Sequence, residues 1–393
     1  MRIVAVADIH EGLNFPYRID TNIGVSERAL DIHNNFVRAS KYAIKNNADL
    51  FVIVGDLFER PHVAPIFREL IRRDVIEPLG RNGIKVWIIA GNHDQPRNFE
   101  RCSSIEDFRG YPHVEVFRKP AIRRIGEDCY IILPYLHPEQ IVGWIEEKIG
   151  KEIPSEQAYE VAQRAIAQWL RRRCEECKGN KIMFAHYYIQ HHRLRLTESL
   201  YSVVLPGEFK LEPHVIPEVN LAVFGHVHLH QKLKTPNSDV VYIGSVERID
   251  WGEKDDTKGF IELKPNGSYK FIELPCREMV KISIDIEEKD NPTSKILEYI
   301  PENIEEKLLR LEIKLPEGKR NLIDEREIIR RLDKSFHYEI RWNQKKEEKI
   351  GFIEYTMDPI VLFRNFVEFN YSEHGKKNEI LKLGIEILNE VLR

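Results

Sequence analysis

The sequence predicts an α/β protein, and two observations indicate that class. Short runs rich in Val and Ile recur along the first two thirds of the chain, without the polar alternation of a half-exposed strand. Longer amphipathic stretches separate these runs. No apolar run reaches the roughly 18 residues that a membrane-spanning helix requires. Buried strands that alternate with helices are typical of a sheet covered by helices.

The apolar runs and the stretches between them give the order of the expected elements. Strands are expected at Ile3–Ala7, Leu50–Val54, Val86–Ala90, Ile131–Leu133, Ile182–Ala185 and Leu221–Phe224. Apolar residues spaced three and four apart predict helices over Ala29–Asn46, Val63–Leu79 and Gln157–Cys174. Two antiparallel strands, Gly259–Leu263 and Lys270–Leu274, are expected on either side of a Pro-Asn-Gly turn.

After Leu274 the pattern of the sequence changes. A strand at Met279–Ile286, a helix near Lys295–Tyr299, a strand at Lys307–Leu315 and a helix at Asp324–Lys334 predict a small α+β unit. An amphipathic helix is expected at Asn378–Leu392. We therefore divide the chain into three domains, residues 1–275, 276–345 and 346–393.

The charge and cysteine content exclude several classes of protein. The chain has 59 Lys and Arg against 63 Asp and Glu, so a site for a polyanion must be local. Five cysteines are too few for a disulfide framework, and we expect Cys174 and Cys177 to form an inert or weakly redox-active pair rather than a zinc site. The acidic residue Asp8 lies too early in the chain for the apolar region of a signal peptide. We therefore expect a cytoplasmic protein.

Polar side chains follow five of the expected strands at the point where each strand ends. The carboxyl ends of the strands in an open α/β sheet meet at one edge, where such sheets bind their ligands. The residues that this edge would bring together are Asp8, His10, Asp56, Asn92, His93, His186, His226 and His228. His230 is an open case, either a group behind the ligands or a residue of the surrounding core.

The residue types at this edge indicate a metal centre. Two carboxylates, one amide oxygen and several imidazoles, without a thiolate, favour Mn²⁺, Fe²⁺ or Zn²⁺. These ligands exceed the needs of one ion and would suit two ions about 3.5–4 Å apart, with one carboxylate bridging them. A paired centre of this kind activates a water and orients a phosphate, which suits phosphoester hydrolysis.

The motifs resemble those of the calcineurin-like metallophosphoesterase superfamily. The segments that carry the resemblance, in chain order, are Asp8-x-His10, Gly55-Asp56, Gly91-Asn92-His93-Asp94, His186 and Gly225-His226-x-His228. Within that superfamily, Gly55–Phe58 and the segment Gly244–Phe260 are similar to SbcD-type nucleases, which repair DNA double-strand breaks. The resemblance covers about residues 1–275.

The resemblance implies a four-layer α/β/β/α sandwich with a small cap domain and two Mn²⁺ ions per chain, with Mg²⁺, Fe²⁺ and Zn²⁺ less favoured. Asp8, His10, Asp56 and His228 would bind one ion. Asp56, Asn92, His186 and His226 would bind the other, with Asp56 as the bridge. His93 would lie near the scissile phosphate and stabilise the transition state or protonate the leaving oxygen.

The same resemblance implies a substrate and partners. The protein would hydrolyse phosphodiester bonds at double-stranded DNA ends, as an exonuclease, an endonuclease or both, in a complex with an SMC-like (SbcC-type) ATPase. Residues 276–345 would control access of DNA. The C-terminal helix would dock on the ATPase, or else pack on its own chain. The apolar stretch Val63–Leu79 suggests a homodimer.

One position departs from the family pattern. Many members have a His after Gly-Asp-Leu-Phe, whereas Glu59 stands here and Arg60-Pro61 follows at once. His62 is the other imidazole that could fill that role. Basic residues expected on loops near the strand ends, and therefore candidates for DNA contacts, are Arg60, Arg97, Arg101, Arg193, Arg195, Arg248 and Lys254.

Two other functions fit the same sequence. One is a phosphodiesterase or phosphatase that acts on a phosphoester other than DNA. The other is a binding protein whose catalysis has been lost, which the change at Glu59 keeps open.

Overall fold

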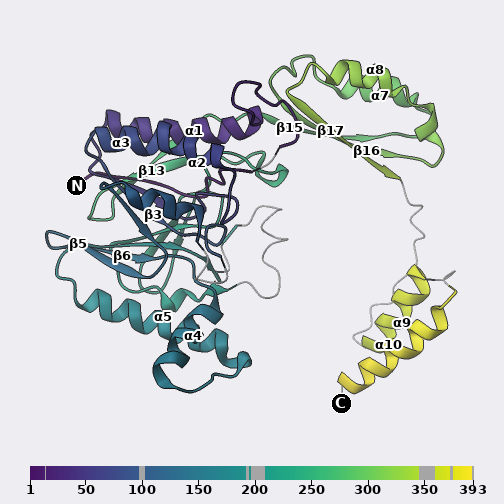
Figure 1. Ribbon diagram of the computed structural model, residues 1–393. Coiled ribbons are helices and arrows are strands. Elements are labelled where there is room, and N and C mark those ends of the chain that lie inside the picture. The colour runs from purple at the N-terminus through teal and green to yellow at the C-terminus, as the bar shows by residue number, and fades with distance from the viewer. Residues whose placement is uncertain are drawn as a thin grey trace.

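The computed structural model describes residues 1–13, 15–96, 102–191, 194–195, 209–344, 359–371 and 375–391 (Figure 1). These residues form two six-stranded sheets, a separate three-stranded sheet, a two-stranded pair of β8 (Tyr188–Ile189) with β9 (Lys210–Leu211), and the helices that cover the larger sheets. No helix in the described part of the chain is both long and apolar enough to cross a membrane.

The first sheet contains the N-terminal strands. Its order is β14 (Tyr269–Glu273), β13 (Gly259–Leu263), β1 (Ile3–Val6), β2 (Leu50–Val54), β3 (Lys85–Ile89) and β4 (Val114–Phe117). Strands β1 to β4 are parallel, whereas β13 is antiparallel to β1 and forms a hairpin with β14. The predicted antiparallel pair is therefore confirmed, and it extends the N-terminal sheet.

The second sheet is built from the middle of the chain. Its order is β11 (Gln231–Lys234), β12 (Asp239–Tyr242), β10 (Leu221–Gly225), β7 (Lys181–His186), β6 (Asp128–Leu133) and β5 (Ala121–Ile125). The four central strands are parallel and the two outer strands antiparallel. Strands β4, β5, β11 and β12 were not expected from the sequence, because each has only four or five residues and at most three consecutive apolar ones.

The two sheets face each other and helices cover their outer faces (Figure 1). In β1, Val4 and Val6 pack beneath helix α1 (Glu27–Lys45), whereas the alternate residues Ile3 and Ala5 pack against the second sheet. In the second sheet, one set of alternate residues packs against α4 (Pro138–Ile149) and α5 (Ala158–Glu175). Burial on both faces explains the continuous apolar runs, and the four-layer sandwich is confirmed.

The predicted helix Val63–Leu79 is interrupted in the structure. It consists of α2 (Pro65–Ile71), a π-helical segment (Arg72–Ile76) and α3 (Glu77–Arg81). Ile71, Val75, Ile76 and Leu79 are fully buried in the core of this chain. Packing within one chain thus accounts for the apolar pattern that suggested a homodimer, which stays a prediction.

The small unit after Pro275 differs from the expected α+β arrangement. Its strands β15 (Met279–Asp285), β16 (Leu308–Leu315) and β17 (His337–Gln344) are all parallel, and helices α7 (Pro292–Tyr299) and α8 (Glu325–Leu332) connect them. The expected α+β class was wrong because β15 and β16 already pair in parallel, and β17, which was not recognised in the sequence, completes a βαβαβ unit. The unit has its own apolar core.

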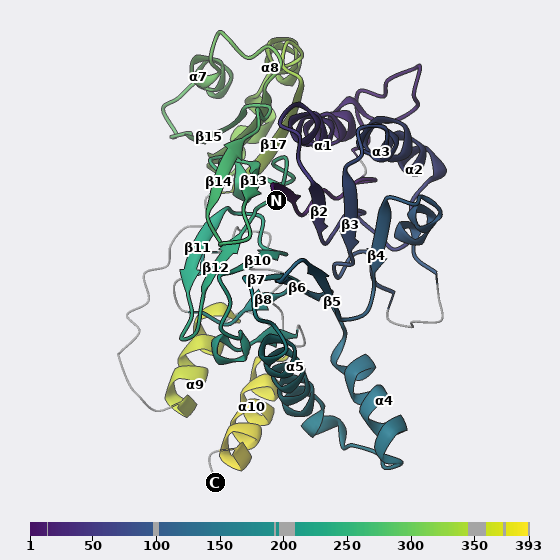
Figure 2. The same ribbon diagram turned by 90° about the vertical axis from the view of Figure 1, so that its left-hand side faces the viewer.

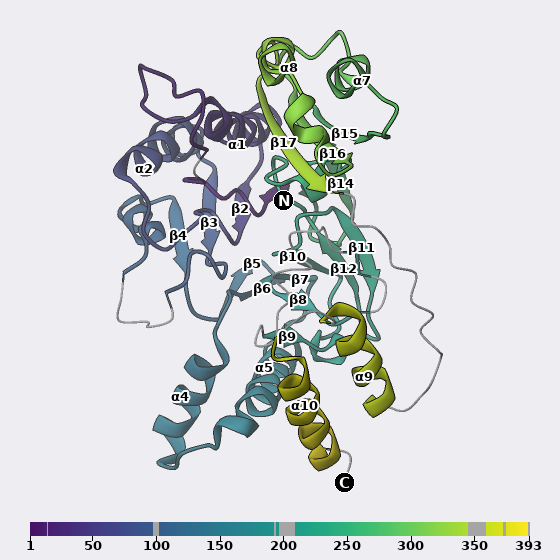
Figure 3. The same cartoon turned by 90° about the vertical axis from the view of Figure 1, so that its right-hand side faces the viewer.

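This unit contacts the first sheet's side of the molecule, beside α1 (Figures 2 and 3). The Arg277 guanidinium donates to both carboxylate oxygens of Asp31 in α1, at 2.8 and 3.0 Å, and lies 3.6 Å from the ring centre of Phe336. The Tyr17 ring stacks on His337 with 3.6 Å between centroids. The domain boundaries near residues 275 and 345 stay predictions.

The C-terminal helices form a hairpin of their own. Helix α10 (Lys377–Val391) packs on α9 (Pro359–Asn370), and the pair stands apart from the sheets in Figure 1. Gly384 allows this packing, because a Cβ atom there would lie 2.1 Å from the Phe363 ring. Side chains that are more than a third exposed on these helices include Val361, Leu362, Phe366, Leu383 and Ile387.

The cysteine expectation was wrong in its pairing. Cys177 forms a disulfide with Cys129, which joins the start of β6 to the segment after α5. Cys174 is a free thiol that packs in the core between α5 and the second sheet, and burial raises its pKa to about 11. The two cysteines of the C-x-x-C pattern therefore have separate roles, one in a disulfide with Cys129 and one in the apolar core.

Candidate metal centre

The ends of five strands meet at one place in the structure, as the sequence predicts. Strands β1, β2 and β3 of the first sheet and β7 and β10 of the second sheet all deliver polar residues there. Three groups of ligand atoms lie within 4.8 Å of one another: Asp8 with His10 and His228, His10 with Asp56 and His93, and Asp56 with His186 and His226. The ligand role of each residue stays a proposal.

The backbone around these residues is held in an unusual conformation. Asp8, His10 and Asp56 have φ of 51°, 56° and 50°, and His226 has φ of 90°. Such values are costly for residues other than glycine and persist only where the surroundings fix them. Here the backbone N–H groups of Ile9 and His10 both donate to the Asp56 carbonyl, at 2.9 and 3.0 Å, and fasten the first loop to the second.

Two glycines of the motifs make room for side chains of the centre. A Cβ atom at Gly55, whose φ is +87°, would lie 1.9 Å from His186 Nδ1. A Cβ atom at Gly91 would lie 2.1 Å from Asp56 Oδ1. Any larger residue at either position would displace one of these groups.

The first half of the centre has the donor atoms that a cation needs. His10 Nδ1 lies 2.8 Å from Glu59 Oε2, and His228 Nδ1 lies 2.7 Å from Glu253 Oε1. A carboxylate accepts hydrogen bonds, so each Nδ1 carries the proton and each Nε2 presents its lone pair. The two Nε2 atoms are 3.1 Å apart. The buried Asp8 Oδ2 beside them has no hydrogen-bond partner.

The second half presents a similar set of donors. His186 Nδ1 donates to the Val54 carbonyl at 2.9 Å, which leaves Nε2 with a lone pair 3.1 Å from both Asp56 Oδ2 and Asn92 Oδ1. Asn92 Oδ1 is also 2.9 Å from His226 Nδ1. Asp56 Oδ2 lies between the halves, 3.8 Å from His10 Nε2. Lone pairs that face one another in a buried site fit a pair of divalent cations.

The charges of the centre affect one another strongly. Burial alone would raise the pKa of Asp56, but His186 and His93 outweigh it and hold that pKa well below its ordinary value. Burial would lower the pKa of His186, yet Asp56 and Asp8 raise it to about 9. The buried carboxylates therefore demand positive charge, which metal ions or protons can supply.

His93 differs from the buried groups around it. Its side chain is 35% exposed, its backbone N–H donates to Asp56 Oδ1 at 2.9 Å, and its Nδ1 donates to the Glu59 carbonyl at 2.8 Å. Although burial lowers the pKa of His93, Asp56 and Glu59 outweigh burial and raise it. An imidazole in this position can hold a proton at the edge of the centre.

Asp94, which had no expected role, fixes the loops of the centre. Its buried carboxylate accepts backbone N–H groups from Leu57, Phe58 and Gly91, at 3.1, 2.9 and 3.0 Å. Burial and the nearby Asp56 raise its pKa to about 6. The position of Asp94 at the end of the Gly91-Asn92-His93-Asp94 motif was the sequence signal for this role.

Glu253 and Lys258 were also missed as parts of the centre. Both are fully buried, and Lys258 Nζ lies 2.9 Å from Glu253 Oε2 and 2.9 Å from the His228 carbonyl. Burial would raise the pKa of Glu253, but Lys258 and His228 hold it well below its ordinary value. The segment Gly244–Phe260 thus holds His228 in place through the contacts of Glu253 with its Nδ1 and of Lys258 with its carbonyl.

The remaining expectations have mixed outcomes. Glu59 contacts His10, whereas His62 is exposed. His230 stacks on Phe271 and its Nδ1 donates to a backbone carbonyl, which is a role in the fold.

Of the basic residues proposed as DNA contacts, some are exposed, some have other partners, and some lie outside the described residues. Arg60 and Arg195 are exposed, and Lys254 pairs with Asp255. Arg248 donates to the carbonyls of Asp256 and Arg277, which is a structural role. Arg97, Arg101 and Arg193 lie outside the described residues.

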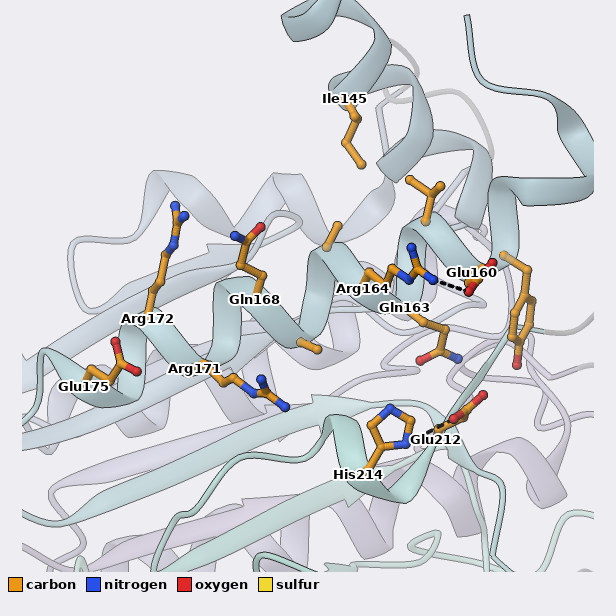
Figure 4. Close-up of a pocket in the computed structure, with 14 residues that line it drawn as sticks. Ile145, Glu160, Gln163, Arg164, Gln168, Arg171, Arg172, Glu175, Glu212 and His214 are labelled. Carbon is orange, nitrogen blue, oxygen red and sulfur yellow. Dashed lines mark hydrogen bonds and ion pairs between the residues drawn. The ribbon is translucent and has the colours of Figure 1, made fainter.

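A hollow of about 1090 Å³ lies along α5, away from the centre (Figure 4). Its charged side chains largely balance, since Arg164 pairs with Glu160 and His214 pairs with Glu212. None of its lining residues belongs to the metal centre, and we assign no function to it.

The chain is similar in sequence to a known family and to several named proteins. The model of the calcineurin-like phosphoesterase family matches residues 1–230. The chain is 26% identical over 298 residues to a DNA double-strand break repair protein Mre11 of Methanocaldococcus jannaschii, covering 72% of this chain and 69% of that protein. It is 23% identical to the protein of the same name from Archaeoglobus fulgidus, over 88% and 75% of the two chains. It is also 23% identical to a subunit of the SbcCD nuclease from Bacillus subtilis, over 67% of each chain.

Proposed function

Because the chain belongs to the calcineurin-like phosphoesterase family, we propose that this metal-dependent hydrolase is a Mn²⁺-dependent nuclease that acts on double-stranded DNA ends. The observation that carries the proposal is the largely buried set of seven donor residues at the ends of β1, β2, β3, β7 and β10, with the half-buried His93 beside it. The names of the relatives, a DNA repair protein and a nuclease subunit, support DNA as the substrate.

We assign the ligands as the geometry of the two halves suggests. Asp8, His10, Asp56 and His228 would hold one Mn²⁺, and Asp56, Asn92, His186 and His226 the other. A bound pair of ions supplies an activated water and stabilises the charge that develops on the phosphate.

The residues around the ions have separate tasks. His93 would hold a proton beside the scissile phosphate and donate it to the leaving oxygen, since its Nδ1 is committed to the Glu59 carbonyl and its pKa is raised. Asp94 and the two glycines would keep the loops in the geometry that the reaction needs.

The other parts of the chain would serve DNA access and assembly. The βαβαβ unit of residues 276–345 would act as the cap, because it contacts α1 and the loop that carries Trp251, whose Nε1 donates to Glu339 at 3.1 Å. The hairpin of α9 and α10 would dock on an SMC-like ATPase through its exposed apolar side chains. The name of the Bacillus subtilis relative, a subunit of the SbcCD nuclease, supports a place for this chain in a larger complex.

The proposal is tested by cleavage of a linear duplex in Mn²⁺, in Mg²⁺ and in chelator, with His93→Ala alongside. We expect cleavage in Mn²⁺ that chelator stops and that His93→Ala largely removes while Mn²⁺ content is kept. Hydrolysis of a small phosphodiester without any cleavage of DNA would overturn the substrate but not the metal centre.

The partner and the oligomeric state need their own measurements. Deletion of residues 375–393 should end association with the ATPase and spare Mn²⁺-dependent cleavage of bare DNA. Light scattering on the full chain would decide whether it forms the homodimer that the sequence suggested.

A further inference from the structure

The two halves of the metal centre differ in the groups behind their imidazoles. In the first half, both imidazoles give their Nδ1 proton to a carboxylate. In the second half, the imidazole of His186 gives its Nδ1 proton to a neutral backbone carbonyl. This difference bears on how tightly each half binds a cation.

Two glutamates support the first half. Glu59 Oε2 is 2.8 Å from His10 Nδ1, and Glu253 Oε1 is 2.7 Å from His228 Nδ1. They come from different parts of the chain, the loop after β2 and the segment before β13. This half therefore has four carboxylates, with Asp8 and Asp56 on the Nε2 side of the two imidazoles and Glu59 and Glu253 on the Nδ1 side.

Lys258 makes the buried charge of Glu253 tenable. An unpaired carboxylate with no exposed surface would be very costly. Lys258 Nζ lies 2.9 Å from Glu253 Oε2, and the Ile249 N–H donates to the same oxygen at 3.0 Å. Glu253 Oε1 is thereby left to His228. The lysine thus keeps the glutamate ionised and directed at the imidazole.

The second half has less negative charge behind its donors. Asn92 contributes a neutral amide, and His186 Nδ1 donates to the Val54 carbonyl at 2.9 Å. The Asp8 Oδ1 atom is 3.9 Å from His186 Nδ1, beyond hydrogen-bonding distance. Asp56 is shared between the halves and does not distinguish them.

A carboxylate that accepts the distal N–H of a metal-binding imidazole fixes its tautomer and raises the basicity of the nitrogen that binds the metal. We propose that Glu59 and Glu253 are positioning residues that make the Asp8–His10–His228 half the tighter of two divalent-cation sites. The proposal rests on the proposed function, because it assumes that both halves bind metal.

The test is calorimetric titration of Mn²⁺ into the metal-stripped full-length chain. Wild-type protein should bind two Mn²⁺ in two steps of unequal affinity. Glu59→Gln should weaken the tighter step by about 10- to 100-fold, the usual effect of losing such a support, and leave the weaker step nearly unchanged. The 23% exposure of the Glu59 side chain makes this variant compatible with folding.

A second variant and a control sharpen the test. Glu253→Gln combined with Lys258→Met removes the other support together with the buried cation that pairs with it, and it should weaken the same step. Glu11→Gln is the matched control, because this buried carboxylate follows His10 in sequence but bonds to His33, at 2.7 Å, rather than to a ligand. Its two binding steps should match those of the wild type.

The outcomes separate the inference from the proposed function. If Glu59→Gln leaves the tighter step unchanged, weakens both steps equally, or acts no differently from Glu11→Gln, the inference is overturned and the two-metal function stands. If the wild type binds no Mn²⁺, the proposed function itself is overturned.

Discussion

Replacing Lys258 with methionine should strongly destabilise the fold, because it leaves a buried carboxylate without its cation. Lys258 and Glu253 have no exposed side-chain surface, and 2.9 Å separates Nζ from Glu253 Oε2. Nζ also lies 2.9 Å from the His228 carbonyl and 3.3 Å from Asp256 Oδ2. The ammonium therefore satisfies three acceptors, and methionine would satisfy none of them.

The expected loss follows from the burial of the pair. Removing one partner of a buried ion pair costs about 3–5 kcal/mol, because the other charge is left uncompensated. In a domain of this size about 1 kcal/mol lowers Tm by roughly 2–4 °C, so Tm should fall by about 10 °C.

Thermal and urea unfolding of the metal-free protein would measure this loss. Lys254→Met is the control, since this lysine lies in the same segment and pairs with Asp255 at the surface. A surface pair contributes about 0–1 kcal/mol. Adding Glu253→Gln to Lys258→Met should recover part of the stability. The reasoning is refuted if Lys258→Met has the same Tm and urea midpoint as the wild type. It is also refuted if the double variant is no more stable than Lys258→Met alone.

Three further predictions concern other parts of the molecule. Asp56→Asn should lower hydrolysis by more than about 100-fold, because it weakens both sites at once, and retained activity in a steady-state assay would contradict the bridging role. Although burial lowers the pKa of His33, its hydrogen bonds with Glu11 and Asp74 raise it, so its stabilising charge is fully present below the ordinary pKa of 6.5 and is lost as pH rises through the folded-state pKa. His33→Asn should therefore cost more stability at about pH 6 than at about pH 9, and urea titrations that give equal losses would count against this. Arg277→Met should speed hydrogen exchange in β15 by about tenfold, since it removes two charged hydrogen bonds to Asp31, and unchanged exchange would mean that this contact does not hold the unit in place.

The chemistry of the centre could be predicted from the sequence because each strand and its polar residues are adjacent in the chain. The run Leu50–Val54 is a strand in the structure with the same bounds, and Asp56 follows it after Gly55. The parallel strands deliver their carboxyl ends to one place, so the location of the site followed from local pattern and a general rule. The order of the five motifs also made the family recognisable from the sequence.

Other features could not be predicted, because they join residues far apart in the chain. Cys177 pairs with Cys129 across 48 residues rather than with its neighbour Cys174. The strands β4, β5, β11 and β12 span only four or five residues, too few to show a clear period, and polar residues occupy alternate positions of β17, so these strands went unrecognised. The small unit is parallel throughout, because β15 and β17 both pair in parallel with β16.

The sequence by itself determined which residue types stand at the strand ends, and with them the metal class and the reaction type, since both depend on side-chain chemistry and local spacing. Only the tertiary structure decided how those residues are supported. The parallel pairing of β1 with β2 brings Glu59 to His10, whereas the facing of the two sheets brings Glu253, with the buried Lys258 beside it, to His228. Such contacts depend on the three-dimensional packing of distant segments, which leaves no periodic signal in the chain.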